Sequence, residues 1–147
     1  MRITLDANIL VRAIVSATGP AKKLLEVVQS DRAHTLVLSS HIVEEVKRVL
    51  AYPRLQSKYR LTAEEIQRTA DVLEQAAEIV EPTVPGPVVL TDPDDDPVLY
   101  TAVEGDVDVL CTLNRDFYEP NVVAFCRERG IAVMSDVELL RELAAKK

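Results

Sequence analysis

Carboxylate and amide side chains recur at several places in this 147-residue chain where they could bind a divalent cation. They are Asp6, Asn8, Glu45, the four aspartates of residues 92–96, Asn114 and Asp116. Oxygen ligands of these types suit Mg²⁺ or Mn²⁺. Any one of them alone is more often a helix cap or a turn residue, so the argument depends on whether the fold brings them together.

Short apolar strands separated by helices would position these groups. Strands are predicted at 2–6, 35–38, 107–113 and 131–134, and helices at 8–16, 20–30, 41–51, 62–80, 95–105, 121–129 and from 135. This alternation predicts right-handed βαβ crossovers and a parallel sheet that is covered on both faces. Ligands bind such sheets beyond the carboxyl ends of the strands, which is where Asp6 and Asp116 are expected.

Helical phase separates the two neighbouring glutamates of the 41–51 helix. The apolar residues of this helix form one stripe, and Glu45 lies at its border beside Val49, whereas Glu44 lies nearly opposite its centre. Glu45 is therefore expected to face a partly covered cleft and Glu44 to face water. A salt bridge between Glu45 and a surface Lys or Arg is the alternative.

The phase of the 95–105 helix bears on Asp95. If this helix includes Asp95, the carboxylate falls in the middle of the buried face, with Leu99 and Ala102 one and two turns later. Such a carboxylate is costly unless it is paired or bound to a metal. Alternatively, Pro97 takes the first helical position and Asp96 caps the helix. Because the acidic residues come from four separate elements, we favour a metal site for the set.

The charge of the chain is divided along its length. The net charge of −7 argues against a polyanionic partner, but residues 1–60 carry a net charge of +5 and residues 61–147 a net charge of −12. Cys111 and Cys126 form no CxxC motif and are expected to be buried free thiols. The charged residues of the first apolar run exclude a signal peptide or membrane span, so we expect a single soluble, cytoplasmic domain over residues 1–147.

Five segments, in this order, resemble the PIN-domain ribonucleases over nearly the whole chain. They are ITLDANIL, LSSHIVEEVKRVL, DPDDDPVLYTA, VDVLCTLNRDF and GIAVMSDVELL. The chain is similar in particular to small bacterial and archaeal PIN proteins related to the toxins of VapBC toxin–antitoxin systems. The resemblance implies a three-layer α/β/α sandwich with a central parallel sheet and an endoribonuclease site that depends on Mg²⁺ or Mn²⁺.

The resemblance also implies roles for individual residues. The catalytic and metal-binding carboxylates would be Asp6, Glu45, Asp95 and Asp116, with Asn8, Thr112 and Asn114 orienting ligands or water around them. Asp95 is followed seven positions later by a small residue, as the family pattern requires. The pattern Thr-x-Asp-x-Asp-Phe is matched except at Asn114, whose amide oxygen brings no charge to a second metal site.

The expected function is metal-dependent hydrolysis of RNA phosphodiester bonds. The resemblance implies the toxin of a toxin–antitoxin pair, with a cognate antitoxin as partner, and a homodimer; a housekeeping nuclease without an antitoxin is the alternative to a toxin. Arg12 and Arg48 are the candidate contacts for RNA phosphates, and His41 is expected to be a surface residue. The alternative is a non-catalytic, degenerate PIN-like module that binds a metal or a partner, which Asn114 favours. A receiver-like signalling domain would need a late lysine at a strand end, and only Lys146 and Lys147 come late.

Overall fold

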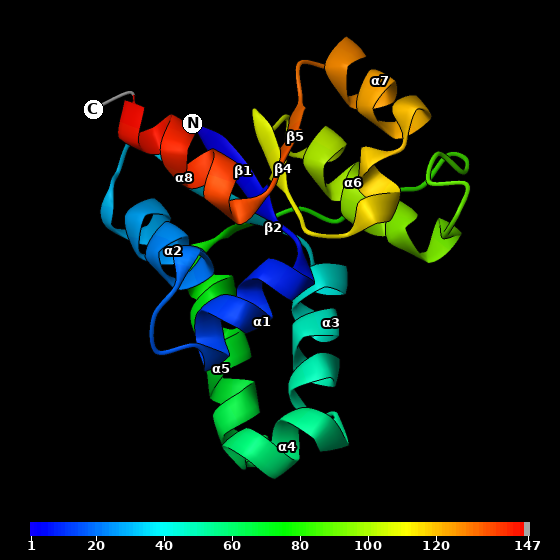
Figure 1. The fold of residues 1–147 in the computed structure, drawn as a ribbon. Helices are drawn as coiled ribbons and strands as arrows, with labels where there is room; N and C mark the ends of the chain where they lie inside the picture. Colours follow the sequence, from blue (N-terminus) through cyan, green and yellow to red (C-terminus); the bar gives the residue numbers. More distant parts are fainter. Residues whose placement is uncertain (146–147) are drawn as a thin grey trace.

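The computed structural model describes residues 1–145, so Lys146 and Lys147 lie outside the described residues. A five-stranded parallel sheet in the order β3-β2-β1-β4-β5 forms the middle layer (Figure 1). Its strands are β1 (Arg2–Leu5), β2 (Thr35–Leu38), β3 (Glu78–Ile79), β4 (Val109–Cys111) and β5 (Ala132–Met134). The buried strands are rich in aliphatic residues, as expected of a sheet with helices on both faces.

Helices cover the sheet on both sides and complete the three-layer α/β/α sandwich that the resemblance implied. On one side lie α1 (Ala7–Val15), α2 (Pro20–Ser30) and α8 (Asp136–Ala145), and on the other lie α6 (Asp96–Glu104) and α7 (Pro120–Glu128) (Figure 1). A helical arm made of α3 (Ser40–Leu50), α4 (Pro53–Tyr59) and α5 (Ala63–Ala76) projects beyond the sheet, with α4 at its tip (Figure 1). Short 3₁₀ turns, η1 (Pro93–Asp95) and η2 (Arg115–Tyr118), precede α6 and α7.

Side-chain caps define where the helices of the arm begin. The Ser39 hydroxyl accepts a hydrogen bond from the backbone N–H of Ile42 at the start of α3. A capping box joins Thr62 and Glu65 at the start of α5, as the sequence predicts. Both caps satisfy backbone donors that a helix leaves unpaired in its first turn.

Two features of the arm differ from the sequence-based expectation. The helix predicted over 62–80 ends at Ala76, because Glu78 and Ile79 pair with β2 as the edge strand β3. The sequence also gave no indication of α4, which has no buried residue and therefore no apolar stripe. Short or exposed elements such as these carry little periodic pattern.

The register of the central strands brings their carboxyl ends together. Leu5 of β1 lies opposite Cys111 of β4, and the backbone N–H of Asp6 donates to the Cys111 carbonyl over 2.9 Å. The residues that follow β1 and β4, Asp6 and Thr112, therefore emerge side by side.

Cys111 and Cys126 are buried free thiols, and burial raises the pKa of Cys126 to about 11. Between residues 1 and 145, no helix combines the length and apolar character that crossing a membrane requires.

Candidate metal centre at the carboxyl edge of the sheet

A polar cleft of about 350 Å³ opens at the carboxyl edge of the sheet, between α3 and the start of α6. Most of the sequence-predicted site residues meet there. The polar side chains that line it are those of Asp6, Asn8, His41, Glu45, Arg48, Asp92, Asp94, Asp95 and Asn114. The structure thus collects groups from four separate segments in one cleft, as the topology of a parallel sheet predicts.

Asp6 lies at the base of the cleft with both carboxylate oxygens engaged. Oδ1 accepts from the backbone N–H of Ala7 over 2.7 Å, and Oδ2 accepts from the Thr112 hydroxyl over 2.7 Å. The residue is only 7% exposed, and burial is the main reason why the pKa of Asp6 is raised, against the effect of these two hydrogen bonds. The two hydrogen bonds therefore hold the Asp6 carboxylate in one orientation, and its burial makes the charged form less stable than it would be in water.

A chain of hydrogen bonds runs from Asp6 to Asp95. The Thr112 hydroxyl accepts from the Asn114 backbone N–H over 3.0 Å, and the Asn114 amide Nδ2 donates to Oδ2 of Asp95 over 2.8 Å. The amide oxygen of Asn114 accepts from the backbone N–H of Asp116 over 3.0 Å and so caps η2. Asn114 therefore orients both Asp95 and the turn that carries Asp116.

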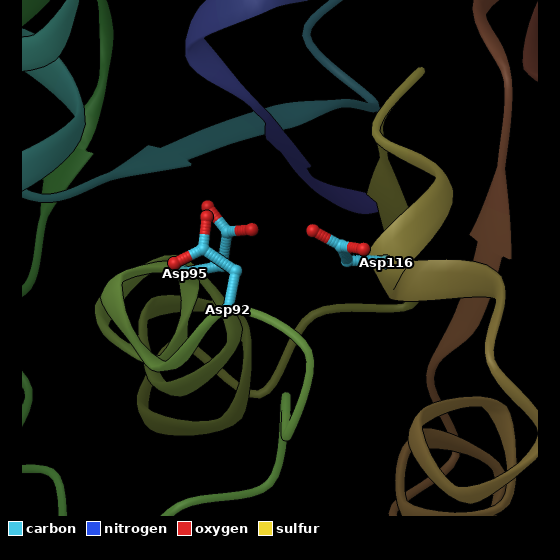
Figure 2. Close-up of side chains that lie close together, drawn as sticks. All are labelled: Asp92, Asp95 and Asp116. Carbon is cyan, nitrogen blue, oxygen red and sulfur yellow. The ribbon is translucent and has the colours of Figure 1, made fainter.

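Three half-buried carboxylates lie close together; Asp92 and Asp95 line the cleft, whereas Asp116 is not among its lining residues. Oxygen atoms of Asp92, Asp95 and Asp116 all lie within 4.8 Å of one another. Figure 2 shows Asp92 and Asp95 on one side, from η1 and the loop before it, and Asp116 pointing at them from η2. Asp6 is not part of this cluster of three and is connected to it through Thr112 and Asn114.

Asp92 belongs to this cluster but is not among the candidate ligands that the sequence indicates. It was counted only among the like charges of residues 92–96, although it precedes Asp95 by three positions, the spacing that places two residues on one side of a 3₁₀ turn. Its Oδ1 accepts from the backbone N–H of Asp94, so Asp92 also caps η1. The spacing was visible in the sequence, but its meaning depended on a 3₁₀ turn that the sequence did not reveal.

Asp95 has the environment of a metal ligand, although it lies in neither of the two predicted helical settings. The helix α6 begins at Asp96, Pro97 follows within its first turn, and Asp95 is the residue that precedes the helix. Its side chain therefore lies beside Asn114 in the cleft and not on the buried face of α6. Burial, followed by the charges of Asp92, Asp6 and Asp116, raises the pKa of Asp95 to about 6, despite the hydrogen bond from Asn114.

The α3 wall of the cleft carries a glutamate, an arginine and a histidine. Glu45 is partly buried and lines the cleft, whereas Glu44 is exposed, in agreement with the helical phase. Glu45 also forms an ion pair with Arg48, the alternative that the sequence left open. His41, expected at the surface, is exposed but lines the same cleft; burial first, and then Arg48, lowers the pKa of His41.

A buried hydrogen bond fixes α3 relative to α6. The Thr101 hydroxyl on α6 donates to the Ser39 hydroxyl over 2.8 Å, and both residues are fully buried. Because Ser39 also caps α3, the start of the helix that carries Glu45 is held against the middle of α6.

The residues present fit a divalent cation. Asn8 lines the cleft with a buried amide oxygen that has no hydrogen-bond partner among residues 1–145, an arrangement that is rare unless a ligand or ion completes it. Asp92, Asp95 and Asp116 add carboxylate oxygens in close mutual contact, and like charges at such distances favour a bound cation. All of the donors are oxygen atoms, which suits Mg²⁺ or Mn²⁺ better than a soft metal ion.

Comparisons with known proteins agree with this architecture. The sequence profile of the family described as PIN domain matches residues 2–116. No curated protein matches the chain. A chain in the crystal structure of VapBC2 from Rickettsia felis, bound to a DNA fragment from their promoter, is similar with a TM-score of 0.58 and 18% identity, over 92% of this chain and 98% of that one. PAE2754 from Pyrobaculum aerophilum is similar with a TM-score of 0.58 and 16% identity, over 99% of this chain and 90% of that one.

Proposed function

Since the chain belongs to the PIN-domain family, we propose that it is a metal-dependent endoribonuclease that hydrolyses RNA phosphodiester bonds in the cleft. The observation that carries this proposal is the convergence of Asp92, Asp95 and Asp116 within 4.8 Å beside the buried Asp6. Several carboxylates at the carboxyl edge of a parallel sheet are costly to hold without a cation. Carboxylates that are placed together at such a cost in stability are typical of a site that binds a ligand.

Asp92, Asp95 and Asp116 would hold Mg²⁺ or Mn²⁺, with Asp6 and Glu45 directly or through water. When bound, the ion would activate water and neutralise the charge that develops on the phosphoryl oxygens. Ala7 and Thr112 keep Asp6 turned toward the cleft, and Asn114 does the same for Asp95. The unpartnered amide oxygen of Asn8 would accept a hydrogen bond from water at the cation site.

The α3 wall offers the contacts that an RNA backbone needs. Arg48 lines the cleft and forms an ion pair with Glu45, and the Arg48 side chain is 62% exposed. Arg48 would bind a phosphate of the substrate next to the scissile one, and His41 would donate a hydrogen bond to the same backbone. Because the chain has a net charge of −7, RNA should bind weakly unless the cation is present.

The test is cleavage of single-stranded RNA by the purified protein with Mn²⁺ or Mg²⁺, and with a chelator. We expect cleavage only with the divalent ion, and a loss of at least about 100-fold in Asp6→Asn and Asp95→Asn. The control is Glu44→Gln, which removes an exposed charge of α3 outside the cleft and should cleave nearly as well as the wild type. Unchanged cleavage by the Asp6→Asn/Asp95→Asn double variant would overturn the proposal.

We further propose that the protein is the toxin of a toxin–antitoxin pair. Support comes from the sequence resemblance to VapC-like proteins and from the shared fold with a chain of the VapBC2 structure. A groove of about 500 Å³ between α2 and α5, lined in part by Leu25, Leu61 and Val72, could receive an amphipathic segment of the antitoxin. A homodimer and a cytoplasmic location remain predictions.

The partner proposal is tested by expressing the chain with the product of the neighbouring upstream reading frame. A stable complex that suppresses cleavage is expected, and Val72→Asp in the groove should weaken it.

The second candidate function, a degenerate PIN-like module without catalysis, is favoured by Asn114 in place of a carboxylate. It predicts that Mn²⁺ binds and that RNA stays intact.

A further inference from the structure

Asp96 is a buried carboxylate that directly follows Asp95 in the chain. The proposed mechanism gives Asp96 no role. The residue is 2% exposed, and its Oδ1 accepts hydrogen bonds from the backbone N–H groups of Val88 and Val89 over 3.0 and 2.9 Å. Among residues 1–145 no lysine, arginine or histidine forms a salt bridge with it. Asp96 is therefore stabilised by the backbone of a distant loop segment and by no cation.

The loop segment that Asp96 holds leads directly to Asp92. The carbonyl of Val89 accepts from the backbone N–H of Asp92 over 3.2 Å, which closes a turn whose two central residues, Leu90 and Thr91, are exposed. The Val89 side chain is fully buried and anchors this turn in the core. Two consecutive hydrogen bonds thus connect the Asp96 carboxylate, through Val89, to the backbone of Asp92.

The arrangement differs from ordinary helix capping. Asp96 is the first residue of α6, where an aspartate commonly interacts with the N–H groups of its own helix. Here both hydrogen bonds reach back seven and eight residues along the chain. The Asn121 amide adds a bond of 2.8 Å to the Val88 carbonyl from α7, so the same segment is tied from two sides.

We propose that Asp96 is a positioning residue for the cation site, which acts by holding residues 88–92 so that the Asp92 carboxylate faces Asp95 and Asp116. This inference rests on the proposed function, because it assigns Asp92 a part in cation binding. Without the bonds to Val88 and Val89, the turn loses its attachment to α6. Asp92 then spends less time near the other two carboxylates, and the affinity for the ion falls.

The test is calorimetric titration of Mn²⁺ into the whole chain and its variants at pH 7. Asp96→Ala should weaken Mn²⁺ binding about tenfold, whereas Asp96→Asn, which keeps an oxygen acceptor, should stay within about threefold of the wild type. The decisive comparison is with Asp92→Asn. If Asp96 acts through Asp92, adding Asp96→Ala to Asp92→Asn should weaken binding by less than about twofold.

Asn121→Ala provides a second variant that leaves α6 intact, for the case in which Asp96→Ala does not fold. It should weaken Mn²⁺ binding about threefold in the wild type and have no effect in the Asp92→Asn background. Glu44→Gln, at an exposed residue that does not line the cleft, controls for the loss of one negative charge and should change the affinity by less than about twofold.

The outcomes separate this inference from the proposed function. If the wild type binds no Mn²⁺, both are wrong. If the wild type binds Mn²⁺ but Asp96→Ala binds it equally well, or loses the same factor in the Asp92→Asn background, the positioning role is wrong and the metal site stands. When Asp96→Ala is unfolded, an Asn121→Ala variant with wild-type affinity overturns the positioning role.

Discussion

The hydroxyl of Thr112 donates a hydrogen bond of 2.7 Å to Oδ2 of Asp6, although the two residues are 106 positions apart in the chain. The parallel register of β1 and β4 creates this contact, because it aligns Leu5 with Cys111 and lets the next residue of each strand meet. The same hydroxyl accepts from the Asn114 backbone. Thr112 is thus the junction between the buried base of the cleft and the residues at its mouth.

Replacing Thr112 by valine should destabilise the protein by about 2 kcal/mol, because the buried Asp6 oxygen loses its partner while the side-chain volume is kept. Urea unfolding of the metal-free protein measures the difference. Thr112→Ser keeps the hydroxyl and removes a buried methyl group, so it should cost only about 1 kcal/mol. Equal costs for the two variants would show that the hydrogen bond contributes little.

The Asn114→Asp variant should bind Mn²⁺ about tenfold more tightly than the wild type. Its metal-free form should have a lower melting temperature at pH 7. In the wild type the Asn114 amide donates a hydrogen bond of 2.8 Å to Asp95. In the variant two carboxylates would repel each other at this place, and a bound cation would relieve the repulsion. The cap of η2 should survive, since a carboxylate oxygen can also accept from the Asp116 N–H. Calorimetry and thermal unfolding measure the two effects.

The control for this variant is Asn114→Ala, which removes the hydrogen bonds without adding a charge. It should weaken Mn²⁺ binding, because Asp95 and η2 are then less well oriented. If Asn114→Asp and Asn114→Ala both weakened Mn²⁺ binding, Asn114 would not face the cation site as the structure indicates.

The stability of the metal-free protein should fall as the pH rises from about 4 to about 6. In this window the folded protein retains a proton on Asp95, whose pKa is raised to about 6, while the unfolded chain, with a pKa near 3.8, has released it. Asp95→Asn removes this cost, so its melting temperature should exceed that of the wild type at pH 7 by about 2–4 °C. The advantage should vanish by pH 4, and a gain that did not depend on pH would contradict the assignment.

Replacing Arg48 by alanine should weaken RNA binding in the presence of Mn²⁺ about three- to tenfold and leave Mn²⁺ affinity nearly unchanged. Arg48 contacts the cleft from α3 and would lose one phosphate contact, so the slope of log K against log salt should fall by about 1. The matched control is Arg54→Ala, an exposed residue of α4 at the tip of the arm. An equal loss in both variants would indicate a general charge effect and no specific contact.

The sequence was sufficient for four of the five strands and for much of the cleft, because both follow from strong local patterns. The alternation of apolar strands and striped helices predicted a parallel sheet, and the exits of its strands placed Asp6 and Asn114 at one edge. The position of Glu45 at the border of an apolar stripe also predicted its place in the cleft. These predictions need only the period of a helix and the direction of the strands.

The remaining features depend on contacts between distant segments, which local patterns do not contain. Asp96 was considered as a helix cap, but its carboxylate is bound by Val88 and Val89 from the proline-rich connector. Asp92 joins the cluster because a 3₁₀ turn and a tight loop fold it back toward Asp95. Both features are set by tertiary hydrogen bonds, and neither leaves a periodic pattern in the sequence.

A crystal structure of the protein soaked in Mn²⁺, with anomalous diffraction, would show whether the carboxylates at the edge of the sheet bind a divalent cation. Cation binding at this edge predicts an anomalous peak between the carboxylates of Asp95 and Asp116, with Asp92 beside it, and no such peak in Asp95→Asn. A peak at another site alone, or no peak while the soaked crystal keeps the arrangement of Figure 2, would contradict it.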